Sequence, residues 1–152
     1  MTTFLNFAIT AADEWIDFEF DIKQFHQSTP IPATAAAIIT TQPKGFCVRG
    51  EHGEPPEEMF WQLLVQMQGT NTASSMANAR LDELLIKVGG FKRCLGDSRF
   101  FTCRHDVHGG VRLGMLSDDG SGSAQTQGGV DYTLELMKRY YTLSKSGPWT
   151  TV

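Results

Sequence analysis

The feature that most constrains the fold is a strict two-residue alternation in WIDFEFDI, residues 15–22. Apolar side chains occupy every second position, and carboxylates occupy the positions between them. Because successive side chains of a strand point to opposite faces of a sheet, this pattern predicts a strand with one buried and one solvated face. The buried side would hold Ile16, Phe18, Phe20 and Ile22, and the solvated side Asp17, Glu19 and Asp21.

Three short apolar runs near this strand have the composition of further strands. They are FLNFAIT at residues 4–10, AAAIITT at 35–41 and GFCVRG at 45–50. A turn through Gln42-Pro43-Lys44-Gly45 would join the last two, because proline and glycine favour tight turns. The first fifty residues are therefore predicted to form a small, mostly antiparallel sheet.

From residue 55 onward the apolar spacing changes to three and four residues, which is typical of helices. Two prolines followed by two glutamates at 55–58 favour a helix start, because proline fixes φ and acids suit the positive end of the helix dipole. Glycines predict where helices end and where a hairpin turns. The expected segments are a helix over 59–68, a second over 72–88, a short third over 91–96, and a hairpin of strands 99–105 and 111–116 turning at Gly109-Gly110.

The rest of the chain is predicted as a flexible Gly/Ser/Gln loop over 117–129 and a last helix over 131–144, capped by Asp131. Since a sheet of a few strands is not stable alone, residues 1–152 are expected to form one domain. The predicted fold class is α+β. Its parts would be an N-terminal sheet over 1–50, helices ending in a winged-helix-like hairpin over 55–116, the loop, and the C-terminal helix.

Cysteine content and hydropathy indicate the compartment. Three cysteines in 152 residues are too few for a disulfide scaffold, and their odd number favours free thiols. No apolar run is long enough to cross a bilayer, and the acidic start lacks the features of a secretory signal. We therefore expect a cytoplasmic, intracellular protein without a membrane partner.

Charge is distributed unevenly along the chain. Residues 1–60 carry nine acids against three bases, whereas residues 80–112 carry seven bases against four acids. This asymmetry favours a surface that contacts a polyanion, although a solvated surface of mixed charge gives the same pattern. The cations assigned to this nucleic-acid-binding surface are Lys92, Arg93, Arg99, Arg104 and Arg112.

One thiol and two imidazoles are concentrated in TCRHDVHGG, residues 102–110, with another thiol upstream. The side-chain types are those that zinc accepts, but the spacing C-x8-C-x-H-x2-H is not that of common zinc sites. The same groups could form a thiol–imidazole catalytic pair, or be small buried thiols and surface histidines of a hairpin. The candidate zinc ligands are Cys94, Cys103, His105 and His108.

The segment GGFKRCLGDSRFFTCRHDVHGGVRLGML resembles the end of a LOTUS-type (OST-HTH) winged-helix domain, with the resemblance covering residues 57–116. In that family a short apolar helix leads through an aromatic strand into the wing. The resemblance implies binding of RNA or of a protein partner, and no catalysis.

The sequence therefore predicts a non-enzymatic binding module without a cofactor. Its 80–112 surface would contact RNA, more readily than DNA, or another polyanion, within a larger assembly. One alternative is an acidic protein-binding inhibitor or immunity-type protein that uses the acidic face of residues 13–21. A second alternative is a small zinc-binding or thiol enzyme.

Overall fold

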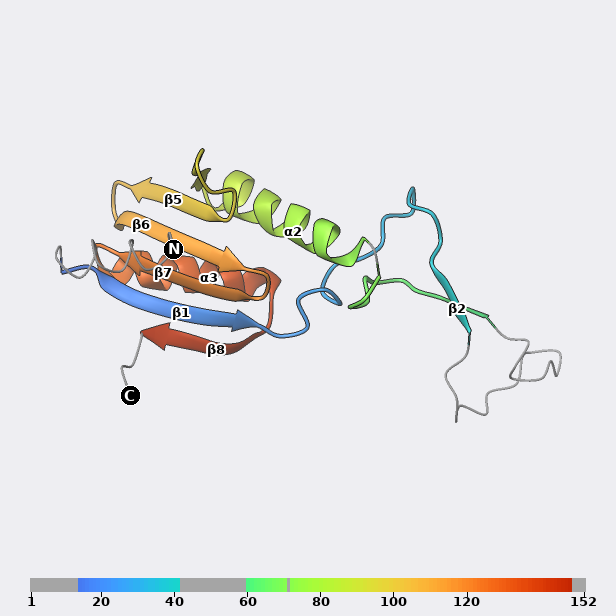
Figure 1. The fold of residues 1–152 in the computed structure, drawn as a ribbon. Coiled ribbons are helices and arrows are strands. Elements are labelled where there is room, and N and C mark those ends of the chain that lie inside the picture. Colours follow the sequence, from blue (N-terminus) through green and yellow to red (C-terminus); the bar gives the residue numbers. More distant parts are fainter. Residues whose placement is uncertain (1–13, 42–59, 71, 149–152) are drawn as a thin grey trace.

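The structure is a computed structural model that describes residues 14–41, 60–70 and 72–148. Its main element is a six-stranded antiparallel sheet with the strand order β4-β5-β6-β7-β1-β8 (Figure 1). The strands are β1 (Ile16–Ile22), β4 (Lys92–Arg93), β5 (Phe100–His105), β6 (Gly109–Leu116), β7 (Asp119–Ala124) and β8 (Leu143–Pro148).

Two helices pack on one face of this sheet. Helix α2 (Ala73–Glu83) continues into a single π-helical turn, η2 (Leu84–Val88), and helix α3 (Gln127–Tyr140) follows β7. The apolar side chains of the strands and helices form one core between the two layers. In the described part of the chain no helix covers the opposite face, which we call the open face (Figure 1).

The alternation over residues 15–22 is confirmed as β1, whose Phe18, Phe20 and Ile22 are buried. The predicted N-terminal sheet is wrong, because β1 pairs with β7 and β8 from the other end of the chain. The fold is thus α+β, but its arrangement is one large sheet rather than a small N-terminal sheet followed by helices. The expected strands at 4–10 and 45–50 lie outside the described residues.

The predicted loop over 117–129 is also wrong, because residues 119–124 form β7 near the centre of the sheet. Its glycines are required by the rings of β1. A Cβ at Gly120 would lie 2.2 Å from Cζ of Phe20, and one at Gly122 would lie 2.6 Å from Cζ of Phe18. A run that reads as a flexible linker is therefore a strand whose missing side chains make room for two buried aromatic rings.

Over the described residues 60–68, extended chain replaces the helix expected over 59–68. Strand β3 (Phe60–Gln62) pairs antiparallel with β2 (Ile39–Thr41), and within the predicted 35–41 strand only residues 39–41 form a strand. We call residues 29–41 and 60–67 the arm, which extends away from the six-stranded sheet (Figure 1). At the base of the arm, the backbone N–H of Gln66 donates a hydrogen bond to the backbone carbonyl of Thr29 at 2.9 Å.

The helix expected over 72–88 is present as α2 and η2, with Ala77, Leu81 and Leu85 fully buried. The apolar spacing of this helix also predicts that Val88 is buried on the same face, but Val88, at the end of the π turn, is exposed. The third helix over 91–96 is wrong, since Lys92 and Arg93 form the edge strand β4.

The winged-helix-like arrangement is therefore wrong as well. The expected hairpin exists as β5 and β6, but these strands lie inside the large sheet rather than projecting as a wing. Its turn lies at residues 106–108, and Gly109 and Gly110 belong to β6.

The last helix is present as α3, and it begins at residue 127, before the predicted position. Thr126 rather than Asp131 caps it, because the Thr126 hydroxyl accepts a hydrogen bond from the Gly129 amide at 3.2 Å. Leu134, Met137 and Tyr141 are buried against the core as the spacing predicts.

Candidate binding surface on the open face of the sheet

The open face is formed by the side chains that alternate with the core residues of each strand. Directly paired residues on antiparallel strands point to the same face, so the pairing register groups these side chains into rows. The first row is Lys92, Thr102, Arg112, Ser123 and Asp17. The second is Phe100, Gly114, Ser121, Glu19 and Gly147, and the third is Leu116, Asp119, Asp21 and Lys145.

Apart from Lys145 of β8, which pairs with Glu19, the charges of this face are separated by sign. Cations occupy the side formed by β4, β5 and β6, where Lys92 and Arg104 are exposed and Arg112 is half-buried. Carboxylates occupy the side formed by β7 and β1. The predicted basic surface and the predicted acidic surface are therefore two halves of one sheet face.

The five predicted cations do not form one surface. Arg93 lies opposite Phe101 and points to the helical side, where its Nη2 is 2.5 Å from Oδ2 of Asp82 on α2. Nη1 of Arg99 lies 3.8 Å from the other carboxylate oxygen of Asp82. Asp82 therefore holds Arg93 on the helical side and lies near Arg99, which also lines the hollow described below. Lys92, Arg104 and Arg112 are the three that β4, β5 and β6 place on the open face.

Trp15 is the residue of this face that the sequence reasoning missed. The guanidinium carbon of Arg112 lies 4.3 Å from the centre of the Trp15 ring, a cation–π distance. The ring reaches across to Gly110, where a Cβ would lie 3.2 Å from its Cη2 atom. A usable signal was present, because Trp15 has the same parity as Asp17 in the alternating strand and is an aromatic side chain on the solvated side.

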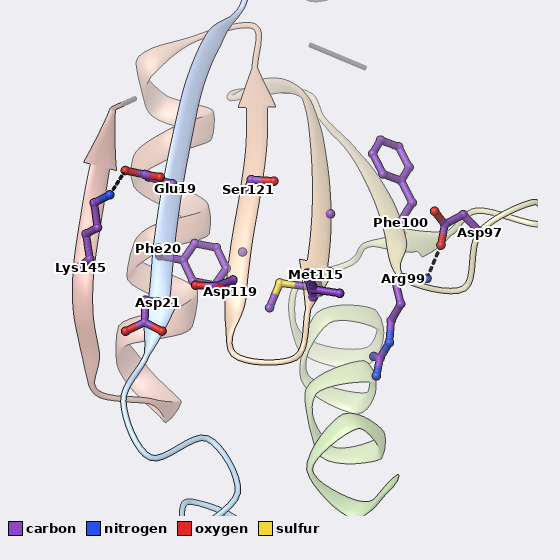
Figure 2. Close-up of a pocket in the computed structure, with 13 residues that line it drawn as sticks. Glu19, Phe20, Asp21, Asp97, Arg99, Phe100, Met115, Asp119, Ser121 and Lys145 are labelled. Carbon is purple, nitrogen blue, oxygen red and sulfur yellow. Dashed lines mark hydrogen bonds and ion pairs between the residues drawn. The ribbon is translucent and has the colours of Figure 1, made fainter. Parts of the chain in front are cut away.

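A hollow of about 610 Å³ lies in the second and third rows (Figure 2). Gly114 contributes no side chain to its floor, and a Cβ there would meet its nearest neighbour, the Ser121 carbonyl oxygen, at 3.6 Å. Phe100 stands on one side of the hollow, and the ion pair between Glu19 and Lys145 stands on the other (Figure 2). The hollow is thus an opening in the side-chain layer above the sheet backbone.

The electrostatics of the hollow are dominated by carboxylates. Loss of hydration raises the pKa of the Asp119 carboxyl, and the neighbouring Asp118, Asp21 and Glu19 raise it further, while Lys145 lowers it. The Ser144 hydroxyl donates a hydrogen bond to the carboxylate of Asp21. This half of the open face repels anions, so a polyanion would have to follow the β4–β6 half.

The candidate zinc ligands are separated by the fold. Cys94 is exposed in the segment after β4, whereas Cys103 points to the helical side of the sheet, with its Sγ 3.8 Å from the carbonyl oxygen of Gly89. The rings of His105 and His108 lie 4.7 Å apart, and both pack against the ring of Tyr132 on α3. Within residues 14–41, 60–70 and 72–148, no three His, Cys, Asp or Glu side chains are grouped so that they could hold a metal ion.

The geometry also disfavours a thiolate nucleophile at Cys103. Burial raises the pKa of the Cys103 thiol, which keeps the sulfur protonated near neutral pH. His105 Nδ1 accepts a hydrogen bond from the Val107 amide at 3.2 Å rather than from a thiol. The histidines pack with Tyr132 as an aromatic cluster at the hairpin tip.

Comparison of the chain with protein-family models, curated proteins and solved structures finds no match. Neither helix of the described residues is both long and apolar enough to span a bilayer. Inference about function therefore depends on the geometry of the open face.

Proposed function

We propose that this protein is a non-enzymatic binding module that contacts single-stranded RNA along the β4–β6 half of its open face. The observation that carries the proposal is the convergence of Lys92, Arg104 and Arg112 from three adjacent strands onto one sheet face that no helix of the described residues covers. Cations on such a face can contact phosphates without reading the bases.

Two aromatic side chains on the same face support RNA over a simple anion. Trp15 is partly exposed beside Arg112, and Phe100 is partly exposed next to the hollow. Proteins that bind single strands combine a basic path for the backbone with aromatic rings on which bases stack. The separation of charge by sign restricts the RNA to the β4–β6 half, because the carboxylates of β1 and β7 repel its phosphates from the other half.

The test compares two double variants that remove the same charges. K92A/R104A removes one lysine and one arginine from the open face, and K138A/R139A removes the same two types from exposed positions on α3. Binding of a fluorescent single-stranded RNA is measured by anisotropy over a series of salt concentrations. The slope of log K against log salt is negative, and each lost phosphate contact on single-stranded RNA reduces its magnitude by about 0.7.

We expect the magnitude of this slope to decrease by about 1.4 in K92A/R104A and to stay at the wild-type value in K138A/R139A. Arg112 is left in place because its contact with Trp15 ties it to the packing of β1. An equal decrease in the magnitude of the salt slope in both variants would show that binding depends only on net charge. Either that result, or the absence of binding by wild-type protein at low salt, would refute the proposal.

A further inference from the structure

The hollow on the open face has the size of a small-molecule site. Its volume of about 610 Å³ lies within the range of roughly 300–1,000 Å³ that is usual for ligand pockets. Gly114 leaves the backbone bare at its floor, and its walls come from β1, β5, β6, β7 and β8 (Figure 2). Five strands therefore supply groups that one small ligand could contact at once.

One wall of the hollow is apolar. Phe100 is half-buried there, so part of its ring is open to a ligand. Leu116, at the end of β6, also lines the hollow and is 78% exposed. A ligand with an apolar body would remove both side chains from water, and the face of the Phe100 ring would in addition attract a positive charge.

The charged part of the lining is negative on balance. It consists of four carboxylates and two cationic side chains, which are Glu19, Asp21, Asp97 and Asp119, with Arg99 and Lys145. Both cations already face carboxylates, because Lys145 pairs with Glu19 and Nη1 of Arg99 lies 3.8 Å from the Asp82 carboxylate of α2. The field inside the hollow therefore favours a positively charged ligand over a neutral or negative one.

Asp119 is the carboxylate of the hollow that lacks a partner. In the described part of the chain, no hydrogen bond or ion pair involves its side chain. Loss of hydration and the nearby Asp118, Asp21 and Glu19 raise the pKa of its carboxyl, and Lys145, which lowers this pKa, is already paired with Glu19. A cation bound beside Asp119 would relieve this repulsion between like charges.

The layout of these groups favours an organic cation over a metal ion. A Ca²⁺ or Mg²⁺ ion needs several oxygen ligands at about 2.0–2.6 Å. Among the described residues, no three acidic, His or Cys side chains are grouped closely enough to hold a metal ion. An ammonium group is satisfied by fewer acceptors, and the carbon atoms attached to it can lie on an apolar wall.

We propose that the hollow binds a small organic cation, with its ammonium group beside Asp119 and its apolar body against Phe100. These two residues belong to β7 and β5, which are two strands and therefore about 10 Å apart. A ring with a two-carbon ammonium arm can bridge this distance. The site does not depend on RNA binding, because the ligand is small and is tested without RNA.

The test uses three probes of the same shape, which differ in charge. They are 2-phenylethylammonium, the neutral 2-phenylethanol and the anion 3-phenylpropanoate, each titrated into the full chain by isothermal calorimetry. We expect saturable 1:1 binding of the cation, binding of the alcohol that is at least about tenfold weaker, and no binding of the anion. Absence of saturable binding by the cation, or equal binding of all three probes, would overturn the proposal.

Three variants then locate the site, and a thermal melt of each checks that it is folded. Asp119→Asn removes the unpaired charge, and Gly114→Leu fills the hollow while every charge is kept, since a Cβ at Gly114 meets its nearest neighbour at an ordinary 3.6 Å. The matched control is Asp131→Asn, which removes the same charge from an exposed position on α3.

Binding of 2-phenylethylammonium should weaken at least about tenfold in Asp119→Asn and in Gly114→Leu, and it should be unchanged in Asp131→Asn. Equal weakening in the two Asp→Asn variants would show that the cation responds only to net charge. Unchanged binding in Gly114→Leu would show that the cation lies outside the hollow. Either result would refute the proposal.

Discussion

Replacing Gly120 by alanine tests the packing of β7 against β1. The added Cβ would lie 2.2, 2.5 and 2.6 Å from three ring carbons of Phe20, where ordinary carbon contacts need about 3.5–4.0 Å. Phe20 is 2% exposed, so any shift of its ring must displace the side chains packed around it. Overpacking of this kind costs about 1–3 kcal/mol and sometimes more, and contact with three atoms places this site at the upper end.

The matched control is Gly114→Ala on the neighbouring strand. Its Cβ would point to the open face and meet Ser121 at 3.6 Å, which is an ordinary contact. Both substitutions reduce the entropy of the unfolded chain, which stabilises each variant by about 0.4–1 kcal/mol. Subtracting one variant from the other therefore isolates the steric cost at Gly120, which we expect to be about 3 kcal/mol.

Urea unfolding followed by circular dichroism measures this difference. With a slope of about 2 kcal/mol per molar urea, the midpoint of Gly120→Ala should lie roughly 1.5 M below that of Gly114→Ala. The double variant F20L/G120A should recover part of the loss, because a smaller side chain leaves room for the methyl group. If the two single variants unfold within about 0.5 kcal/mol of each other, β7 does not pack under Phe20 as described.

Two further predictions concern titratable groups. The pKa of the Asp119 carboxyl is higher in the folded state than in the unfolded state, so ionisation of this group opposes folding. At neutral pH, Asp119→Asn should therefore melt at a higher temperature than wild type. This difference in melting temperature should vanish as the pH falls below that pKa. A pH series of thermal melts checks this, and equal melting temperatures at neutral pH would contradict it. Cys94 is exposed, whereas Cys103 is partly buried with a raised pKa, so maleimide should label Cys94 in the folded protein and Cys103 only after unfolding. Mass spectrometry of the labelled peptides reads the outcome, and equal labelling of the two thiols in folded protein would contradict the placement of Cys103.

Local patterns in the sequence were sufficient for elements whose two faces differ. The alternation at 15–22 indicates directly which side chains are buried, and it predicts β1. The spacing of Leu134 and Met137 does the same for α3. The pattern at 59–68 has the same appearance as a buried helix face. The described side chains Phe60, Leu64 and Met67 are instead exposed on the arm. Local periodicity alone does not distinguish a helix face that is buried in a core from exposed extended chain.

Other elements depend on residues far away in the sequence. The strand β7 reads DGSGSA and carries little apolar signal, because the space above its glycines is filled by Phe18 and Phe20 of β1. The sequence predicts only in part which face of the sheet each cationic side chain points to. Parity within β5 and β6 places Arg104 and Arg112 opposite the core, but the pairing of Arg93 with Asp82 follows from an edge strand that the spacing of 91–96 did not indicate.

The position of β1 in the sheet has a consequence for the order of folding. Asp21 of β1 and Ser144 of β8 are hydrogen-bonded although they are 123 residues apart, and the other neighbour of β1, β7, is also near the far end of the chain. Pairs of such high sequence separation close slowly, because a long loop must be ordered before the contact forms. During synthesis β1 therefore emerges before β7 and β8, and its apolar face stays unpaired until those strands have been translated. Its three carboxylates keep the waiting strand in water and discourage it from pairing with other chains.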